Sequence, residues 1–209
     1  MPMKIKVCGM RDPSNIKSID ALGIDFMGFI FYNKSPRFTN YSSDHKSPIK
    51  AQKIGVFVNS SQEELLTKVV EHQLRYVQLH GSESSEFCAQ LSQKGVAIVK
   101  AFQVDNFFDF ELIKAYESVC SYFLFDAKGK HYGGNGIQFN WQILKNYRLD
   151  TPYFLSGGID LESIEKLKNM HLPGLYAIDI NSKFEIDPGM KNIELVKLLT
   201  QKLSTLKYH

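Results

Sequence analysis

The sequence predicts a single (β/α)8 barrel that spans residues 1–209. Short apolar runs alternate with amphipathic stretches along the whole chain, as is typical of α/β proteins. Eight such units can be counted, at roughly 26 residues each, which suits a compact barrel. Glycine-rich loops occur late in the chain rather than after the first strand, which favours a barrel over the alternative, a doubly wound open sheet. No linker or change in composition marks a second domain.

The predicted strands are short segments rich in apolar residues. The second of them is apolar throughout from Phe26 to Phe31, as expected of a strand that is covered on both faces. The eight strands are predicted at residues 5–8, 25–31, 53–59, 76–79, 96–102, 121–125, 153–155 and 176–180.

Capping residues mark the starts of two helices. Asp12 can cap a helix with Pro13 in its first turn, and Ser61 and Glu64 have the spacing of a capping box. Residues 32–51 have room for at most a short helix, and long loops in compact domains usually carry function. Helices are predicted at about residues 12–22, from 61, from 82, and at 107–118, 140–145, 160–169 and 192–206.

The composition is that of an ordinary globular protein, with 44% hydrophobic and 22% charged residues. A net charge of +3, with both signs interspersed, argues against a nucleic-acid partner. Cys8, Cys88 and Cys120 have neither metal-ligand nor disulfide-framework spacing, which favours a reducing cytoplasm. No signal-peptide segment and no run of about 20 apolar residues is present, so no membrane association is expected.

Reactive residue types collect at the carboxyl ends of the predicted strands. In a barrel these ends meet at one mouth, where active sites lie. The side chains and loop glycines expected there are Cys8, Arg37, Gln78, His80, Asp126, Gly133, Gly134, Gly136, Gly157, Gly158, Asp179, Asn181 and Ser182.

The glycines predict a phosphate site. Phosphate sites in barrels commonly use the loops after strands seven and eight, where backbone N–H groups meet the anion. Gly157, Gly158 and Ser182 lie in these two loops, and the loop that contains Gly134 can help to close over the ligand. A pair of glycines on its own is also typical of a tight turn.

Asp126 ends an apolar strand and is a candidate general acid. The alternation of a strand places Tyr122, Leu124 and Asp126 on one face. A carboxyl group buried among aromatic side chains keeps its proton more readily, so that it can donate it to a substrate. The alternatives are an aspartate paired with a lysine or one that caps the next loop.

Cys8 lies on the same strand face as Lys6. A nearby ammonium is expected to lower the pKa of the thiol and to supply thiolate, which could act as a base or as a nucleophile. Two alternatives remain. The cysteine can be a small buried apolar residue, and Lys6 can instead neutralise Asp126 or Asp179 inside the barrel.

Arg37 and His80 are candidates for binding and support. A guanidinium forms paired hydrogen bonds with a carboxylate or a phosphate, although a loop arginine can also be simply solvated. His80 lies at a strand end, where support of a catalytic group is favoured over catalysis. No cluster of His, Cys, Asp and Glu has the spacing of a metal site.

An ordered set of motifs covers nearly the whole chain and resembles phosphoribosylanthranilate isomerase. No single motif is decisive, but the ordered set is highly specific. The motifs are Lys6-Val7-Cys8-Gly9-Met10, Ser35-Pro36-Arg37, Gly55-Val56-Phe57-Val58-Asn59, Gln78-Leu79-His80-Gly81, Leu124-Phe125-Asp126-Ala127-Lys128, Gly133-Gly134-Asn135-Gly136 with Phe139 and Trp141, Leu155-Ser156-Gly157-Gly158-Ile159, and Asp179-Ile180-Asn181-Ser182 with Glu185 and Pro188-Gly189.

The resemblance implies a cytoplasmic barrel enzyme of tryptophan biosynthesis, monomeric or homodimeric, that acts without metal or cofactor on a phosphorylated small molecule. It implies an Amadori rearrangement of N-(5-phosphoribosyl)anthranilate. Asp126 would be the general acid and Cys8 the general base. Arg37 would hold the anthranilate carboxylate and Asp179 would contact the sugar hydroxyls. The phosphate would meet backbone groups around Gly157, Gly158 and Ser182.

Three departures from the family pattern bear on the loops of the phosphate site. Asn135 stands where the family usually has threonine, Asn140 where aspartate is common, and Lys183 where glycine is usual. The backbone at Lys183 can therefore approach the phosphate differently, or its ammonium can contribute charge.

Two other functions are compatible with a phosphosugar barrel. One is a related enzyme, such as an indole-glycerol-phosphate synthase-like or ribulose-phosphate epimerase-like activity, but the sequence lacks the catalytic residue sets of both. The other is a non-catalytic phosphosugar-binding subunit, against which the presence of both Cys8 and Asp126 argues.

Overall fold

The computed structural model describes residues 3–40, 48–128 and 138–204. Eight parallel strands form a closed barrel in sequence order. β8 pairs with β1, so the sheet has no free edge and is not the open doubly wound alternative. The predicted barrel is confirmed. Its strands are β1 (Lys4–Val7), β2 (Phe26–Ile30), β3 (Gln52–Phe57), β4 (Tyr76–Leu79), β5 (Ala97–Val104), β6 (Tyr122–Ala127), β7 (Tyr153–Leu155) and β8 (Leu175–Ile180).

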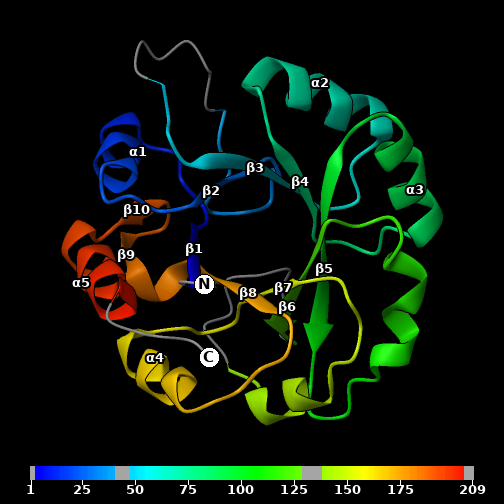
Figure 1. Cartoon of the computed structure of the whole chain (residues 1–209). Helices are drawn as coiled ribbons and strands as arrows, with labels where there is room; N and C mark the ends of the chain where they lie inside the picture. Colours follow the sequence, from blue (N-terminus) through cyan, green and yellow to red (C-terminus); the bar gives the residue numbers. More distant parts are fainter. Residues whose placement is uncertain (1–2, 41–47, 129–137, 205–209) are drawn as a thin grey trace.

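Helices surround the ring of strands (Figure 1). None of those in the described ranges is long and apolar enough to cross a membrane. Among the described residues between β2 and β3 no helix forms. The helices are α1 (Pro13–Asp20), α2 (Gln62–His72), α3 (Ser85–Gln93), α4 (Leu161–Lys168) and α5 (Ile193–Ser204), together with the 3-10 helices η1 (Phe110–Tyr116) and η2 (Trp141–Asn146).

Asp12 and Ser61 are confirmed as N-caps, but of the capping box predicted at Ser61 and Glu64 only the Ser61 bond is present in the described residues. The side chain of Asp12 accepts a hydrogen bond from the N–H of Asn15 at 2.8 Å, and Ser61 accepts one from the N–H of Glu64 at 3.2 Å. Each cap satisfies a backbone donor that the first helical turn leaves free. The third helix begins later than predicted, because Ser84 rather than Ser82 is its N-cap.

The segment predicted as a helix at 107–118 is instead a short 3-10 helix, η1. Aromatic packing defines this segment more than helical periodicity does. Phe108 and Phe110 both make edge-on contacts with Phe125, with ring centroids 6.2 and 5.6 Å apart. Burial of these large rings against β6 outweighs the regular hydrogen bonding of an α-helix.

The barrel interior is filled by aromatic side chains toward the amino ends of its strands. Phe26, Tyr76, Tyr122, Phe154 and Tyr176 pack together there, with ring centroids 4.9 to 6.5 Å apart. A second and larger apolar layer lies between the barrel and the helices. The aromatic cluster fills the amino end of the interior, and the buried side chains of Cys8, Asp126 and Asp179 lie at the carboxyl end.

A small hairpin between β8 and α5 was not predicted. It follows the 3-10 helix η3 (Ser182–Phe184) and consists of β9 (Glu185–Asp187) and β10 (Met190–Lys191). The side chain of Asn15 exchanges two hydrogen bonds of 2.9 Å with the backbone of Lys191, which ties the hairpin to α1. The hairpin therefore has a fixed place beside the barrel mouth.

Candidate active site

The structure brings four predicted site residues to the carboxyl end of the barrel. Cys8 follows β1, His80 follows β4, Asp126 lies near the end of β6 and Asp179 near the end of β8. Cys8, Asp126 and Asp179 are all buried. The charges of Asp126 and His80 both act on the pKa of Asp179, so these three groups share one polar region.

Lys6 connects Cys8 to Asp179. Its Nζ donates a hydrogen bond of 2.9 Å to Oδ2 of Asp179, and both side chains are buried. Of the alternatives considered for Lys6, neutralisation of Asp179 is therefore confirmed. Lys6 also acts on the Cys8 thiol, whose pKa it lowers. The ammonium of Lys6 therefore interacts with both the Cys8 thiol and the Asp179 carboxylate.

Lys6 lowers the pKa of the Cys8 thiol, as expected, but the net shift of this pKa is upward. Burial raises the pKa of the thiol, and this outweighs the lowering effects of Lys6 and Lys191. Asp179 adds to the rise because its negative charge opposes a thiolate. Burial also raises the pKa of Asp179, against the attraction of Lys6. Lys6 shares its charge between two acidic groups, so it does not by itself make Cys8 a ready thiolate.

Asp126 faces His80 across the barrel mouth. Its Oδ2 lies 3.4 Å from Nε2 of His80, and its Oδ1 accepts a hydrogen bond of 3.0 Å from the N–H of Ala127. Nδ1 of His80, on the other side of the ring, lies 2.8 Å from Nε2 of Gln78. This contact orients the imidazole toward Asp126. Leu124 belongs to the apolar cluster inside the barrel, so the predicted alternation along β6 is confirmed.

Three buried polar atoms in this region have no hydrogen-bond partner within the described part of the chain. They are Oδ1 of Asp179, Nε2 of His80 and Oε1 of Gln78. Buried polar atoms without a partner are rare, because leaving one unsatisfied costs about 1–3 kcal/mol. Two donors or acceptors at the mouth, from Asp179 and His80, are thus available to a ligand.

Gly28 provides room for the Cys8 thiol and was missed by the sequence analysis. It lies on β2 beside Cys8, and a Cβ at this position would come within 2.8 Å of the Cys8 Sγ. An isolated glycine inside a predicted strand signals a close approach of another group. That signal was present in the apolar run at 26–31.

Arg37 reaches the site but is already bound to a carboxylate. Its Nε lies 2.9 and 3.0 Å from the two carboxylate oxygens of Glu185, and its Nη2 lies 2.7 Å from Oε2. Lys191 approaches the same carboxylate, with Nζ 2.5 Å from Oε1, and donates a hydrogen bond of 2.7 Å to Asn181. Burial alone would raise the pKa of Glu185, but its hydrogen bond from Arg37 and the charge of Lys191 hold this pKa below its usual value.

The cluster of Arg37, Glu185 and Lys191 carries two cationic side chains and one anionic side chain. Lys191 is fully buried and its charge also acts on Cys8. Its role was not predicted, since the hairpin that carries it was not predicted. The turn at Pro188-Gly189 was the available signal, because this pair is typical of a reversal of the chain.

The glycines after β7 lie next to Asp126. Gly157 and Gly158 have positive φ angles of 89° and 64°, which glycine adopts without strain. A Cβ on Gly157 would come within 2.8 Å of the Ala127 nitrogen and 3.2 Å of the Asp126 Oδ1. The side chain of Gln138 donates a hydrogen bond of 2.8 Å to the carbonyl of Gly158.

The remaining predicted phosphate residues are only partly described. Ser182 begins η3, directly after β8, and the following Lys183 is exposed. Gly134 lies outside the described residues. The structure therefore places Gly157, Gly158 and Ser182 after two adjacent strands, β7 and β8, as the sequence predicted.

Comparisons with known proteins agree with one another. A family model described as N-(5'phosphoribosyl)anthranilate (PRA) isomerase matches residues 5–202. A relative from Parabacteroides distasonis, named N-(5'-phosphoribosyl)anthranilate isomerase, is 43% identical over 206 residues, which cover 96% of this chain and 93% of the relative.

Solved structures give the same result. The chain is similar to phosphoribosyl anthranilate isomerase from Thermotoga maritima, with a TM-score of 0.85, 30% identity, and coverage of 98% of this chain and 100% of that one. A phosphoribosyl anthranilate isomerase solved in complex with reduced 1-(o-carboxyphenylamino)-1-deoxyribulose 5-phosphate gives a TM-score of 0.79 at 27% identity, with 98% and 100% coverage.

Proposed function

We propose a catalytic mechanism on the premise that the chain belongs to the N-(5'-phosphoribosyl)anthranilate isomerase family, enzymes of tryptophan biosynthesis. The reaction is the conversion of N-(5-phosphoribosyl)anthranilate to 1-(o-carboxyphenylamino)-1-deoxyribulose 5-phosphate, with Asp126 as general acid and Cys8 as general base. The observation that supports the mechanism is that Cys8, Lys6, Asp126 and Asp179 are all buried at one barrel mouth, where Lys6 binds Asp179 and acts on Cys8, and the charge of Asp126 acts on Asp179.

Asp126 starts the reaction. It gives its proton to the ring oxygen of the ribose, the bond from that oxygen to C1′ breaks, and an iminium forms between C1′ and nitrogen. The position of Asp126 supports this role, since its carboxyl group is buried at the barrel mouth beside His80 and Gly157. The imidazole of His80, 3.4 Å away, faces the carboxylate that remains after the proton has left.

Cys8 completes the rearrangement as its thiolate. It takes the proton from C2′, and the electron pair of that bond forms the C1′–C2′ double bond of an enolamine while the iminium nitrogen becomes neutral. The enolamine then gains a proton at C1′ and loses one from the C2′ hydroxyl, which gives the ketone. Lys6 and Lys191 support the thiolate with positive charge, although burial opposes it.

The rest of the substrate is held by groups around this pair. The unpartnered Oδ1 of Asp179 is a suitable acceptor for a sugar hydroxyl, and Nε2 of His80 is a second polar contact. Backbone groups around Gly157, Gly158 and Ser182 would meet the phosphate, with help from the loop that contains Gly134. The anthranilate carboxylate would bind near Arg37, in the cluster formed by Arg37, Glu185 and Lys191, which has a net positive charge.

The test is turnover of freshly made phosphoribosylanthranilate, followed by loss of its fluorescence. Cys8→Ala and Asp126→Asn should each lower kcat by a factor of about 100 or more while KM changes little, because each group acts in a proton-transfer transition state. Cys120→Ala is the control and should leave kcat unchanged. A wild-type protein without turnover, or variants in which only KM rises, would contradict the mechanism.

A further inference from the structure

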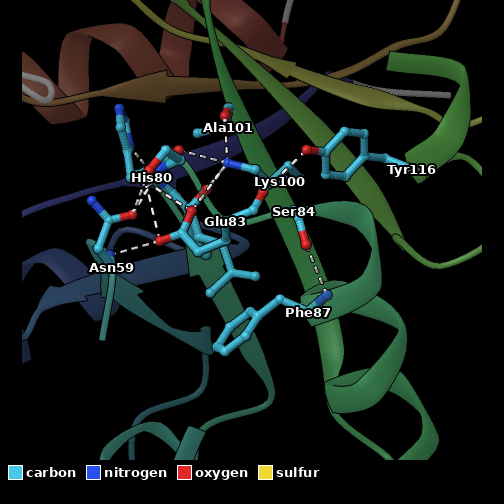
Figure 2. A network of polar contacts seen from close by, with 12 residues as sticks. Asn59, His80, Glu83, Ser84, Phe87, Lys100, Ala101 and Tyr116 are labelled. Atoms are coloured by element: carbon cyan, nitrogen blue, oxygen red, sulfur yellow. Dashed lines mark hydrogen bonds and ion pairs between the residues drawn. The ribbon is translucent and has the colours of Figure 1, made fainter. Parts of the chain in front are cut away.

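Glu83 and Lys100 form a buried ion pair that the mechanism does not use. Oε2 of Glu83 lies 3.1 Å from Nζ of Lys100, and each side chain is only 3% exposed. Lys100 lies on β5, and Glu83 lies in the loop between β4 and α3 (Figure 2). A buried ion pair contributes little or nothing to stability compared with apolar side chains, because its desolvation offsets its attraction. Its presence therefore calls for a role other than stability.

Lys100 holds the backbone on both sides of His80. Its Nζ lies 3.2 Å from the carbonyl oxygen of Leu79 and 2.9 Å from that of Gly81. These are the two residues that flank His80 in the sequence. The ammonium of Lys100 thus holds the backbone immediately before and after His80 (Figure 2).

Glu83 ties the same loop to the loop that follows β3. Its carboxylate accepts hydrogen bonds from the N–H of Gly81 at 3.0 Å and from the N–H of Asn59 at 2.8 Å. Asn59 returns the contact, since its Oδ1 accepts from the N–H of Ser82 at 2.8 Å. The loop that carries His80 is therefore bound by Lys100 on β5 and by Asn59 in the loop after β3.

Packing alone leaves this loop open on one side. A cavity of about 270 Å³ lies beside His80 and is bounded by Glu83, Lys100, Phe102 and Tyr116. Apolar packing therefore does not hold the loop on the side of this cavity. Polar contacts from the ion pair provide the restraint from this direction.

We propose that the pair of Glu83 and Lys100 positions His80 against Asp126 for the acid step. It acts through the loop and touches no reacting atom, so both are positioning residues. When Asp126 has released its proton, the imidazole held 3.4 Å away stabilises the new carboxylate. This inference rests on the proposed function, which makes Asp126 the acid.

The test removes both charges together, with Lys100→Met and Glu83→Gln in one chain, so that no single buried charge is left without a partner. We expect kcat to fall about tenfold while KM changes less than about threefold. This pattern is expected when a substitution removes an interaction that stabilises the transition state but not the bound substrate. The matched control is Lys4→Met with Asp25→Asn, a pair at the other end of the barrel. That control should leave kcat unchanged, and a loss in kcat equal to that of the first variant would overturn the proposal.

A double-mutant cycle separates positioning from a merely structural role. In a His80→Ala background the same two substitutions should produce no further fall in kcat, because the residue through which they act is gone. An equal fall in both backgrounds would overturn the proposal. Asn59→Gly keeps the positive φ of 51° but removes the Oδ1 contact, and should lower kcat about threefold. An unchanged kcat in Asn59→Gly would also contradict the positioning of His80 through this loop.

A measurement without substrate distinguishes failure of this inference from failure of the proposed function. The ring carbon and nitrogen NMR signals of His80 should shift in the Glu83 and Lys100 variant and stay in place in the Lys4 and Asp25 control. If the wild type lacks turnover, the proposed function fails and the NMR comparison alone decides on positioning. Unchanged His80 signals would overturn it.

Discussion

Glu185 binds the guanidinium of Arg37 with both of its carboxylate oxygens, at 2.7 to 3.0 Å. The two residues are 148 positions apart, and the ion pair joins the loop after β2 to the hairpin after β8. Arg37 therefore reaches the mouth in a fixed orientation, with part of its hydrogen-bonding capacity already used. This arrangement changes what is expected of variants at both positions.

Arg37→Ala should raise KM more than it lowers kcat. The proposed contact with the substrate carboxylate is made in the ground state and the transition state alike, so its loss weakens binding uniformly. We expect KM to rise about tenfold or more in the fluorescence assay. Arg11→Ala, an exposed arginine that bonds to the carbonyl of Pro36 in the same loop, is the control. An unchanged KM in Arg37→Ala would remove Arg37 from the carboxylate site.

Glu185→Gln should weaken both binding and folding. The glutamine amide can accept fewer hydrogen bonds from the Arg37 guanidinium than the carboxylate does. It also leaves the fully buried Lys191 without its carboxylate partner. Removing one partner of a buried pair costs about 3–5 kcal/mol, which urea unfolding would detect together with a raised KM. Asp187→Asn, an exposed change in the same hairpin, should alter neither. Stability equal to that of the wild type would show that Lys191 does not depend on Glu185.

The stability of the protein should fall at alkaline pH in part because of Cys8. Burial raises the pKa of its thiol in the folded state, so the folded protein holds this proton more tightly than the unfolded chain. The resulting stability is complete below the unfolded pKa of about 8.5 and is lost as pH rises toward the folded pKa, by up to about 1.4 kcal/mol per pH unit. Urea unfolding at several values from pH 7 to 10 should therefore show a steeper loss in the wild type than in Cys8→Ala. Parallel losses would contradict the raised pKa.

Gly157→Ala should damage catalysis as well as stability. Its φ of +89° strains any side chain, and the added Cβ would lie 3.2 Å from Oδ1 of Asp126 and 2.8 Å from the Ala127 nitrogen. Gly95→Ala is a matched control, since Gly95 has a similar φ of +81° with no atom within 4 Å of the added Cβ. Both variants should lose about 1 kcal/mol from backbone strain.

The two glycine variants should differ in turnover. We expect kcat to fall at least about tenfold in Gly157→Ala, because displacement of Asp126 disturbs the proton transfer. Gly95→Ala should retain the kcat of the wild type. Equal kcat values in the two variants would show that the position of Asp126 does not depend on Gly157.

Much of the barrel and the location of the site could be predicted from local pattern. The strand at 76–79 and the strand at 153–155 are found at the predicted residues, because short apolar runs between turn signals depend only on neighbouring residues. The caps at Asp12 and Ser61 are local for the same reason. The β9–β10 hairpin was missed, since two strands of two and three residues provide too little periodicity to detect.

By itself the sequence determined the order of strands and helices and the residue types at the carboxyl ends of the strands, because both follow from hydrophobic period and turn chemistry over a few residues. Only the tertiary structure decided which charges meet. Lys6 pairs with Asp179 across 173 positions, and Arg37 with Glu185 across 148. It also decided that burial outweighs Lys6 at the Cys8 thiol. Desolvation and Coulomb energies depend on distance and burial in space, which no local pattern encodes.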